Sequence, residues 1–248
     1  MFSFKLATEI IQFDRFAEFI QAYSVGPDDL LITNEVIYNN NLREYKLDCH
    51  VLFQEKYGYG EPNDKMINQL IAEAKTLQYS RIIAVGGGTV IDISKILSLK
   101  VTDDVLDLLY GKVPVEKVKK LIVIPTTCGT GSEVTNISIL EDTQAKVKKG
   151  IVHSDLFPDQ AVLIPELLKS LPYKFFAFSS IDALIHAVES YLAPRSNPIS
   201  ELFSVKAMNL IISAYQKIVR EGKDAVCSHI DEVLLASTFA GIAFANTG

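Results

Sequence analysis

Three consecutive glycines, Gly86–Gly88, separate a β-branched run from a segment with helical spacing. The run Arg81–Val85 predicts a buried strand, and Thr89–Lys95 predicts the start of a helix. Glycines without a Cβ let the backbone approach a pyrophosphate closely, and the unpaired amides at a helix start favour negative charge. Ile91 stands where the usual dinucleotide fingerprint has its last glycine, so that fingerprint is not met. The turn therefore predicts either a phosphate site or a tight strand-to-helix turn without a ligand.

Strand and helix patterns alternate over the first two thirds of the chain. Four further β-branched runs predict strands at Leu30–Thr33, His50–Gln54, Leu121–Ile124 and Ala161–Ile164. Before the glycine turn, apolar residues recur at helical spacing over Asp64–Gln78. This alternation is typical of βαβ units, so the sequence predicts an α/β fold with a mostly parallel sheet.

The last third of the chain has a different character. Strand signals stop near Pro165, and helices are predicted at Tyr173–Leu192, Pro198–Arg220 and His229–Ala245. Prolines punctuate these segments, and proline disfavours helix in the residue before it. We expect a domain boundary near residues 165–172. An α/β domain would then cover residues 1–168, and an all-helical domain would cover residues 169–248.

Composition excludes several classes of partner. The net charge is −6 and the basic residues form no stripe, so nucleic acid is not an expected partner. The short basic run Lys146–Lys149 is typical of a solvated turn. The cysteines stand far apart, which argues against a disulfide scaffold and a thiolate zinc site. The chain start has too short an apolar run for a secretion signal, and no stretch reaches about 18 uninterrupted apolar residues. We therefore expect a cytoplasmic protein without a membrane partner.

A second loop rich in glycine and hydroxyls, Pro125–Glu133, follows the predicted strand at Leu121–Ile124. Ligands in open α/β sheets collect at this carboxyl edge. The hydroxyls can hydrogen-bond a phosphate, a ribose or a carboxamide, and Gly129 and Gly131 would let the chain fold closely over a cofactor. Cys128 has no histidine near it in sequence, so we expect it to pack beside the loop rather than to act as a nucleophile.

Asp182 and His186 stand four residues apart in a segment with strong helical preference, so both should leave one face of a helix. An oxygen and a nitrogen ligand at this spacing suit iron(II) or zinc. The alternative is an Asp–His pair that only braces the helix. The remaining histidines are expected to be structural or solvated: His50 at a strand start, His153 in a connecting segment and His229 at the start of a surface-like helix.

Three motifs taken together resemble the iron-containing alcohol dehydrogenase family in their order and spacing. They are Gly-Gly-Gly-Thr-Val-Ile-Asp at 86–92, Pro-Thr-Thr-Cys-Gly-Thr-Gly-Ser-Glu at 125–133 and Asp-Ala-Leu-Ile-His-Ala-Val-Glu at 182–189. The resemblance also covers segments 61–63, 156–159, 165–172 and 240–246, and so extends over nearly the whole chain. It implies an N-terminal α/β domain that binds NAD or NADP, a helical C-terminal domain, and a divalent metal, iron or zinc, in the cleft between them.

The resemblance also assigns roles to individual residues. The pyrophosphate would be held by Gly86, Gly87, Gly88 and Thr89. The nicotinamide side would be touched by Thr126, Thr127 and Thr130, and the same motifs assign Asp92 and Ser132 to the cofactor. Asp182 and His186 would be the first two metal ligands. The metal would act as a Lewis acid that lowers the pKa of a substrate hydroxyl, so that hydride can pass to the nicotinamide. The implied partner is a small alcohol or aldehyde, and a homo-oligomer is expected.

The sequence departs from the family pattern in two places. The family has two further histidine ligands in a segment expected just beyond Gly248, where this sequence stops. Asn34, assigned to the cofactor site, stands where many NAD-preferring members have aspartate. A carboxylate there would bond the ribose diol and repel a 2′-phosphate, so Asn34 leaves NADP open.

Three functions stay open on these residues. Segments 149–154 and 179–182 are similar to those of 4-hydroxybutyrate dehydrogenases, which implies 4-hydroxybutyrate and succinate semialdehyde as substrates. A sugar-phosphate cyclase of the dehydroquinate synthase type shares the architecture, a bound NAD and a metal, although Ala-Val-Glu after His186 favours the alcohol dehydrogenases. The missing ligands leave a nucleotide-binding module without catalysis as the third reading.

Overall fold

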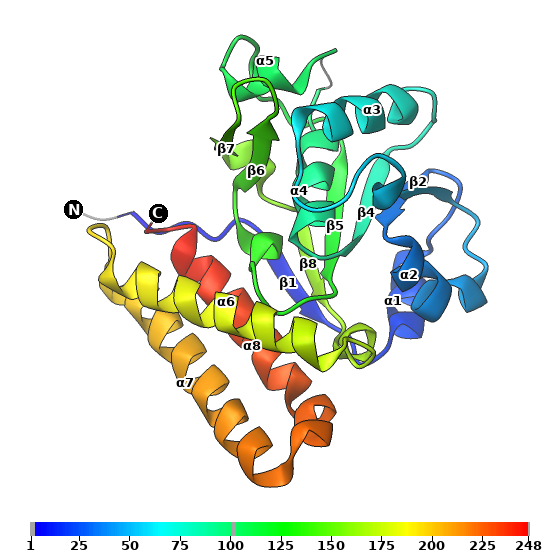
Figure 1. Ribbon diagram of the computed structural model, residues 1–248. Helices are drawn as coiled ribbons and strands as arrows, with labels where there is room; N and C mark the ends of the chain where they lie inside the picture. The colour runs from blue at the N-terminus through cyan, green and yellow to red at the C-terminus, as the bar shows by residue number, and fades with distance from the viewer. Residues whose placement is uncertain (1–2, 101–102, 248) are drawn as a thin grey trace.

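The computed structural model describes residues 3–100 and 103–247. Within them, parallel strands form a six-stranded sheet in the order β1-β8-β5-β4-β2-β3 (Figure 1). The strands are β1 (Glu9–Gln12), β2 (Asp29–Thr33), β3 (His50–Phe53), β4 (Arg81–Gly86), β5 (Lys120–Pro125) and β8 (Gln160–Leu163). The side chains of β2, β4 and β5 are almost all buried, as strands covered on both faces require. The predicted α/β fold with a mostly parallel sheet is confirmed.

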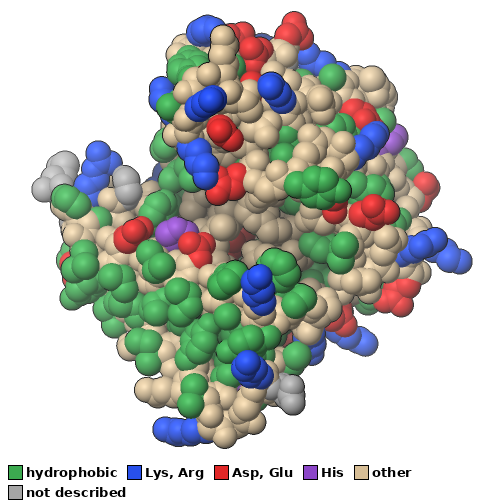
Figure 2. Space-filling model, viewed as in Figure 1, with side chains coloured by type: hydrophobic (Ala, Val, Ile, Leu, Met, Phe, Trp, Pro, Cys, Tyr) green, Lys and Arg blue, Asp and Glu red, His purple; other side chains and the backbone are tan. Residues whose placement is uncertain are grey.

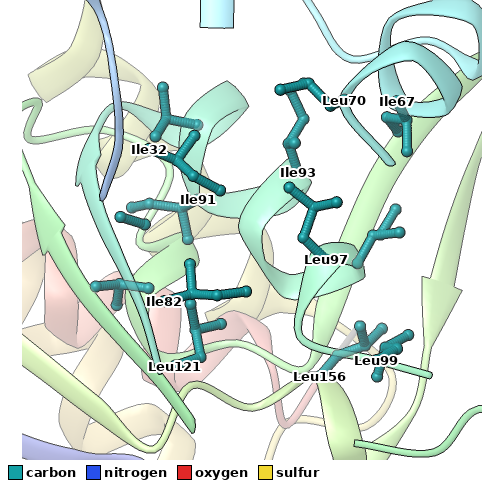
Figure 3. Close-up of a cluster of buried hydrophobic side chains, with 14 of the residues drawn as sticks. Ile32, Ile67, Leu70, Ile82, Ile91, Ile93, Leu97, Leu99, Leu121 and Leu156 are labelled. Atoms are coloured by element: carbon teal, nitrogen blue, oxygen red, sulfur yellow. The ribbon is translucent and has the colours of Figure 1, made fainter. Parts of the chain in front are cut away.

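Different helices cover the two faces of the sheet. On one face, α3 (Asp64–Ala74) and α4 (Gly88–Leu97) pack against alternate residues of β2, β4 and β5 (Figure 3). On the other face, α1 (Phe16–Tyr23) and α8 (Val226–Phe244) pack against the intervening residues. Short helices, α2 (Glu35–Ile37) and α5 (Val105–Leu109), lie in the connections. Successive side chains of a strand point to opposite faces, so one sheet organises both cores.

The C-terminal part is helical, as predicted. Helices α6 (Tyr173–Leu192), α7 (Pro198–Glu221) and α8 pack against one another around small and aliphatic side chains. Helix α7 begins after Asn197, whose side chain accepts hydrogen bonds from the first-turn amides, and Pro198 occupies its first turn. Helix α8 has the length and apolar composition of a membrane span, but 67% of that stretch is buried inside the protein. Its apolar surface is therefore accounted for by packing on the sheet, α6 and α7.

Hydrophobic side chains gather on the outer surface of α6 and α7 (Figure 2). Phe178, Leu192 and Leu202 are each more than half exposed on these helices. Scattered exposed apolar residues are ordinary, but a gathered set on neighbouring helices is the usual mark of a surface that contacts protein.

The chain order places a switch point between β2 and β4. From β2 the chain crosses to β3 on one side, and it then returns to β4 on the other side of β2. Connections that diverge in this way leave a crevice at the carboxyl ends of the two strands. Asn34 follows β2 and Gly87 follows β4, so both lie at the mouth of this crevice.

Two features of the α/β part were not predicted. They are the edge strand β1 and an antiparallel hairpin of β6 (Ile137–Asp142) and β7 (Val147–Val152). Strand β1 has only four residues, and β7 is exposed at all but Ile151, so neither shows the apolar pattern of a buried strand. The expected turn at Lys146–Lys149 is a turn only at Lys146, because the strand already begins at Val147.

The expected surface position of His229 is wrong. Helix α8 begins at Val226, and His229 is only 9% exposed. Its Nε2 lies 3.3 Å from the Glu221 carboxylate at the end of α7. The neighbouring charged residues Asp231 and Glu232 suggest a solvent-exposed helix start, but the imidazole of His229 faces α7 rather than solvent.

Candidate functional site: a two-part cleft

The carboxyl ends of β2, β4 and β5 open into a cavity of about 480 Å³. The glycine turn contributes Gly87, Gly88 and Thr89 to its lining, and the loop after β5 contributes Thr126 and Thr127. The two loops are joined by a hydrogen bond, because the Thr126 amide donates to the Gly86 carbonyl at 3.0 Å. The structure thus brings the two sequence motifs together at one edge of the sheet.

Helix α4 begins at this cavity. Its N-cap is Gly87, which is extended and provides no side-chain cap for the first-turn amides. Those amides have no partner within the helix, and the helix dipole is positive at this end. Gly88, Thr89 and Val90 of the first turn all line the cavity, so this end of the helix is placed to bind an anion.

The three glycines differ in what surrounds them. A Cβ on Gly86 would lie 2.6 Å from the Val90 side chain, and one on Gly88 would lie 2.8 Å from the Thr130 methyl. A Cβ on Gly87 would meet the Thr127 methyl at 3.3 Å, which a shift of a few tenths of an ångström can relieve. Gly86 and Gly88 are therefore needed for packing, whereas Gly87 has the least packing reason to be glycine.

A second cavity of about 450 Å³ adjoins the first, because Gly88 and Thr89 line both. Thr130 from the β5 loop and the Asp182 and His186 side chains of α6 line this second cavity. Figure 2 shows the molecule hollowed on this face. The glycine turn and the Asp-x-x-x-His helix, almost 100 residues apart in sequence, therefore border one continuous cleft.

Asp182 and His186 leave the same face of α6, as their spacing predicts. The His186 Nε2 lies 3.9 Å from the Asp182 Oδ1, which is too long for a hydrogen bond. The imidazole is 22% exposed, and its ring lies 4.9 Å from the Phe244 ring of α8. Among the described residues, no group of three or more His, Cys, Asp or Glu converges on a metal position. The pair therefore fits half of a divalent-metal site, one oxygen and one nitrogen ligand that face the cleft.

Asp92 and Ser132 also line the second cavity, but their side chains are engaged with the protein. The Ser132 hydroxyl donates to Asp92 Oδ1, and the Ile139 amide donates to Asp92 Oδ2 at 3.0 Å. Lys95, which the sequence analysis did not single out, is fully buried beneath them. Its ammonium donates to Ser132, Thr135 and the Ile137 carbonyl at 2.7–2.9 Å and lies 3.3 Å from Asp92.

Burial lowers the pKa of Lys95, and the adjacent Asp92 carboxylate opposes that shift. A buried ammonium with this many acceptors joins α4 to the β5 loop and β6. The only sequence signal for it was a lysine within the apolar face of α4, where Ile91, Ile93 and Leu97 are also buried.

The sequence led us to expect that Gly129 and Gly131 make room for a cofactor. In the structure they make room for neighbouring helices instead. A Cβ on Gly129 would lie 2.9 Å from the Ser179 side chain and carbonyl of α6. A Cβ on Gly131, whose φ is 60°, would lie 2.5 Å from the Gly241 Cα of α8. These contacts depend on the tertiary arrangement, so the sequence alone could not distinguish them from ligand contacts.

Cys128 packs beside the loop, as expected. It is fully buried, and its Sγ lies 3.3 Å from the Ser179 hydroxyl of α6. Burial raises the pKa of the Cys128 thiol to about 11. A thiol that stays protonated at neutral pH is a poor nucleophile, so the side chain has a packing role.

Lys148 is a further cleft residue that the sequence analysis missed. It lies on β7, lines the second cavity and forms an ion pair with Glu61 from the loop before α3. The hydrogen bond to Glu61 raises the pKa of Lys148, so its ammonium stays charged at neutral pH. Among the residues that line this cavity, it is the only lysine or arginine. In the sequence, Lys148 stands within the basic run Lys146–Lys149, which is typical of a solvated turn and so did not indicate a cleft residue.

Asn34 lines the first cavity, as do Asn40 and Asn41. Its Nδ2 donates to the Gln54 Oε1 at 3.2 Å. The lining of this cavity contains no aspartate or glutamate among the described residues. At the Asn34 position the first cavity is therefore lined by an amide rather than by a carboxylate.

Two family models match the chain. One, described as iron-containing alcohol dehydrogenase, matches residues 13–165, and the other, described as the C-terminal part of the Fe-containing alcohol dehydrogenase family, matches residues 176–248. A 4-hydroxybutyrate dehydrogenase of Clostridium kluyveri is 52% identical over 98% of this chain and 66% of its own length. A sulfoacetaldehyde reductase of Bilophila wadsworthia is 36% identical over 75% of this chain and 48% of its own length.

Solved structures of similar fold cover the whole chain. An iron-containing alcohol dehydrogenase from Thermotoga maritima superposes with a TM-score of 0.82 at 25% identity, covering 100% of this chain and 70% of that one. A sulfoacetaldehyde reductase from Bifidobacterium kashiwanohense, solved with NAD+, has a TM-score of 0.87 at 22% identity and covers 100% and 68%. The chain thus spans about two thirds of the length of the first curated relative and about half that of the second.

Proposed function

Because the chain belongs to the iron-containing alcohol dehydrogenase family, we propose that it provides the dinucleotide cleft and two metal ligands of an NAD(P)-dependent alcohol dehydrogenase. One observation carries this proposal. The cavity at the start of α4 and the cavity that Asp182 and His186 line share Gly88 and Thr89. A dinucleotide with its pyrophosphate on the helix start would therefore place its two ends in different cavities, with one end beside the metal ligands.

The lining residues divide between the two ends of such a cofactor. The pyrophosphate would accept hydrogen bonds from the first-turn amides of α4. Thr126 and Thr127, which the resemblance assigns to the nicotinamide side, line the first cavity with those amides rather than the second cavity with Thr130. The adenosine end would lie toward Asn34. The nicotinamide end would lie beside Thr130, where the Lys148 ammonium can donate to ribose or phosphate oxygens. Because Asn34 carries no charge, both NAD and NADP remain candidates.

Asp182 and His186 would hold a divalent metal, iron or zinc, together with ligands that the described residues do not supply. Such an ion supplies a Lewis acid that lowers the pKa of a substrate hydroxyl. The chain's own part is to orient the two ligand side chains. Helix α6 sets their spacing, and the Phe244 ring packs against His186 from α8.

We propose a small alcohol as the substrate, with 4-hydroxybutyrate as the first candidate. The 52% identity to a 4-hydroxybutyrate dehydrogenase supports that choice. The second cavity also has an apolar wall of Pro62, Ile139 and Phe244 that suits the methylene groups of a short chain. The reverse reaction would reduce succinate semialdehyde.

Three coarser assignments accompany this function as proposals. The α/β domain would end at residue 168 and the helical domain would begin at 169, since the short turn at Pro165–Leu168 separates β8 from α6. A cytoplasmic location fits the unpaired cysteines, because disulfides are rare there. A homo-oligomer would cover part of the apolar surface on α6 and α7.

Two other functions share parts of this cleft. A sugar-phosphate cyclase would also bind a dinucleotide and a metal, but it would regenerate the dinucleotide within each turnover. A nucleotide-binding module would bind the dinucleotide with neither metal nor turnover. Net conversion of NAD(P) by an alcohol therefore distinguishes the proposed enzyme from both alternatives.

Replacement of Gly87 by alanine tests the dinucleotide site. The wild-type chain should bind NADH or NADPH in calorimetry. Gly87→Ala should weaken that binding by about 10-fold or more, because it adds a methyl beside Thr127 in the lining of the first cavity. Each 1.4 kcal/mol of lost binding free energy is about a tenfold loss of affinity. The melting temperature should change little, since the new Cβ meets only the Thr127 methyl at 3.3 Å.

Gly86→Ala is the matched control, because its Cβ would lie 2.6 Å from Val90 and should lower the melting temperature. If folded wild-type protein binds neither NADH nor NADPH, the cofactor assignment is wrong. If Gly87→Ala lowers the melting temperature but leaves the affinity of the folded protein unchanged, the turn is only structural.

A further inference from the structure

The loop after β5 contacts both halves of the cleft. Toward the cofactor side, its Ser132 and Thr135 hydroxyls accept hydrogen bonds from Lys95 of α4 at 2.8 and 2.9 Å. Toward the helical side, its buried Glu133 accepts a hydrogen bond from the Thr238 hydroxyl of α8 at 2.8 Å. The loop is therefore tied to the helix that would bind the pyrophosphate and also to the helices beside the metal ligands.

The contact with α6 is made at Gly129. The nearest atoms to a Cβ on Gly129 would be the Cβ, carbonyl oxygen and Cα of Ser179, at 2.9–3.0 Å. Two of these are backbone atoms, which cannot move aside as a flexible side chain can. Ser179 stands three residues before Asp182, which is about one helical turn. This contact therefore fixes the turn of α6 that carries the ligand pair.

The contact with α8 is made between two glycines. A Cβ on Gly241 would lie 2.8 Å from the Gly131 Cα and still closer to its carbonyl oxygen. Phe244 follows Gly241 by one turn, and its ring packs at 4.9 Å against the His186 ring. The second contact therefore sets the position of His186 from the opposite side.

We propose that Gly129 and Gly241 are positioning residues that set the distance between the nicotinamide end of the cofactor site and the Asp182–His186 pair. This inference rests on the proposed function. Both contacts join backbone to backbone, so any side chain at these positions moves a whole helix relative to the loop. Hydride transfer depends steeply on such a distance, because a displacement of about 1 Å can cost about 100-fold in rate.

Two substitutions test the contact from its two sides. Gly129→Ala adds a methyl at a backbone conformation that alanine adopts, since its φ is not in the left-handed region. Gly241→Ala lies within α8, where alanine is the better helix former, so any effect must arise from the approach to Gly131. Gly26→Ala is the control, because its Cβ would have only the Ser24 carbonyl, at 3.7 Å, within 4 Å.

The readout needs no metal. The chain has four histidines, so the imidazole proton spectrum is simple, and saturating NADH should shift His186 by the ring current of the nicotinamide. In Gly129→Ala and Gly241→Ala this shift should change, while the NADH dissociation constant and the His50 signal stay as in the wild type. In the protein extended to the length of its curated relatives and loaded with iron, single-turnover hydride transfer should fall about 100-fold with KM unchanged.

An unchanged His186 shift in both variants, or an unchanged transfer rate, would overturn the inference and leave the proposed function standing. No His186 shift in wild-type protein saturated with NADH would also overturn it, because the nicotinamide then lies elsewhere. Loss of folding in both variants would show that the contacts are needed for stability rather than for positioning. Failure of the wild-type chain to bind either NADH or NADPH would instead reject the proposed function.

Discussion

Replacement of His186 by alanine is expected to abolish metal retention and alcohol turnover in the protein extended to the length of its curated relatives. His186 is the only histidine among the residues that line the second cavity. Without it, α6 presents only the Asp182 carboxylate, and the site loses the imidazole nitrogen that suits iron(II) or zinc. Elemental analysis should find about one ion per chain before the change and almost none after it. Binding of NADH should persist, because the glycine turn lies on α4 rather than on α6.

His153→Ala is the matched control for this experiment. Its imidazole is partly exposed, accepts a hydrogen bond from the Asp155 amide and does not line either cavity. The control should keep both metal and turnover. If the His186→Ala protein kept its metal and its rate, this histidine would only brace α6.

Replacement of Lys95 by methionine is expected to destabilise the folded chain by about 3 kcal/mol, the range for removing one partner from a buried ionic network. The ammonium is fully buried and donates to three oxygens at 2.7–2.9 Å. Methionine has a similar length but no donor, so the Asp92 carboxylate and the Ile137 carbonyl lose a partner. Urea unfolding at neutral pH measures the change.

Lys65→Met is the control, because it makes the same change, loss of a positive charge and gain of an apolar side chain, at an exposed position. Lys65 is an exposed residue of α3, so its replacement should leave the free energy of unfolding within experimental error. If Lys95→Met unfolded at the same urea concentration as Lys65→Met, the network would not stabilise the junction of α4 with the β5 loop.

The sequence predicted the central sheet well because its inner strands are covered on both faces. Such strands read as continuous apolar runs, and Arg81–Gly86 and Lys120–Pro125 show that pattern. The edge strand Glu9–Gln12 and the lysine-rich strand Val147–Val152 are largely exposed, so their pairing is invisible in the apolar pattern. Pairing of such strands is decided by tertiary context.

The residues of the candidate site also fall into two groups, those that a local sequence pattern predicts and those whose role depends on tertiary contacts. The motif containing Gly87 and the Asp182–His186 spacing are local patterns, and the structure places both at one cleft. The roles of Gly129 and Lys95 depend on contacts with segments 40 to 50 residues away, Ser179 for the glycine and Thr135 and Ile137 for the lysine. No local pattern encodes such contacts. Gly129 was therefore assigned to the cofactor, and Lys95 was not distinguished from the other residues of its helix.

The decisive measurement is the net reduction of NAD+ or NADP+ by 4-hydroxybutyrate, which is oxidised to succinate semialdehyde as the nicotinamide takes its hydride. The measurement uses the extended protein loaded with iron or zinc, and it follows nicotinamide absorbance over many turnovers. Reduced cofactor should accumulate steadily and stop accumulating when a chelator removes the metal, because the ion would stabilise the developing charge on the substrate oxygen. A protein that binds the dinucleotide and the metal but produces no net reduced cofactor from 4-hydroxybutyrate or other small alcohols would contradict it.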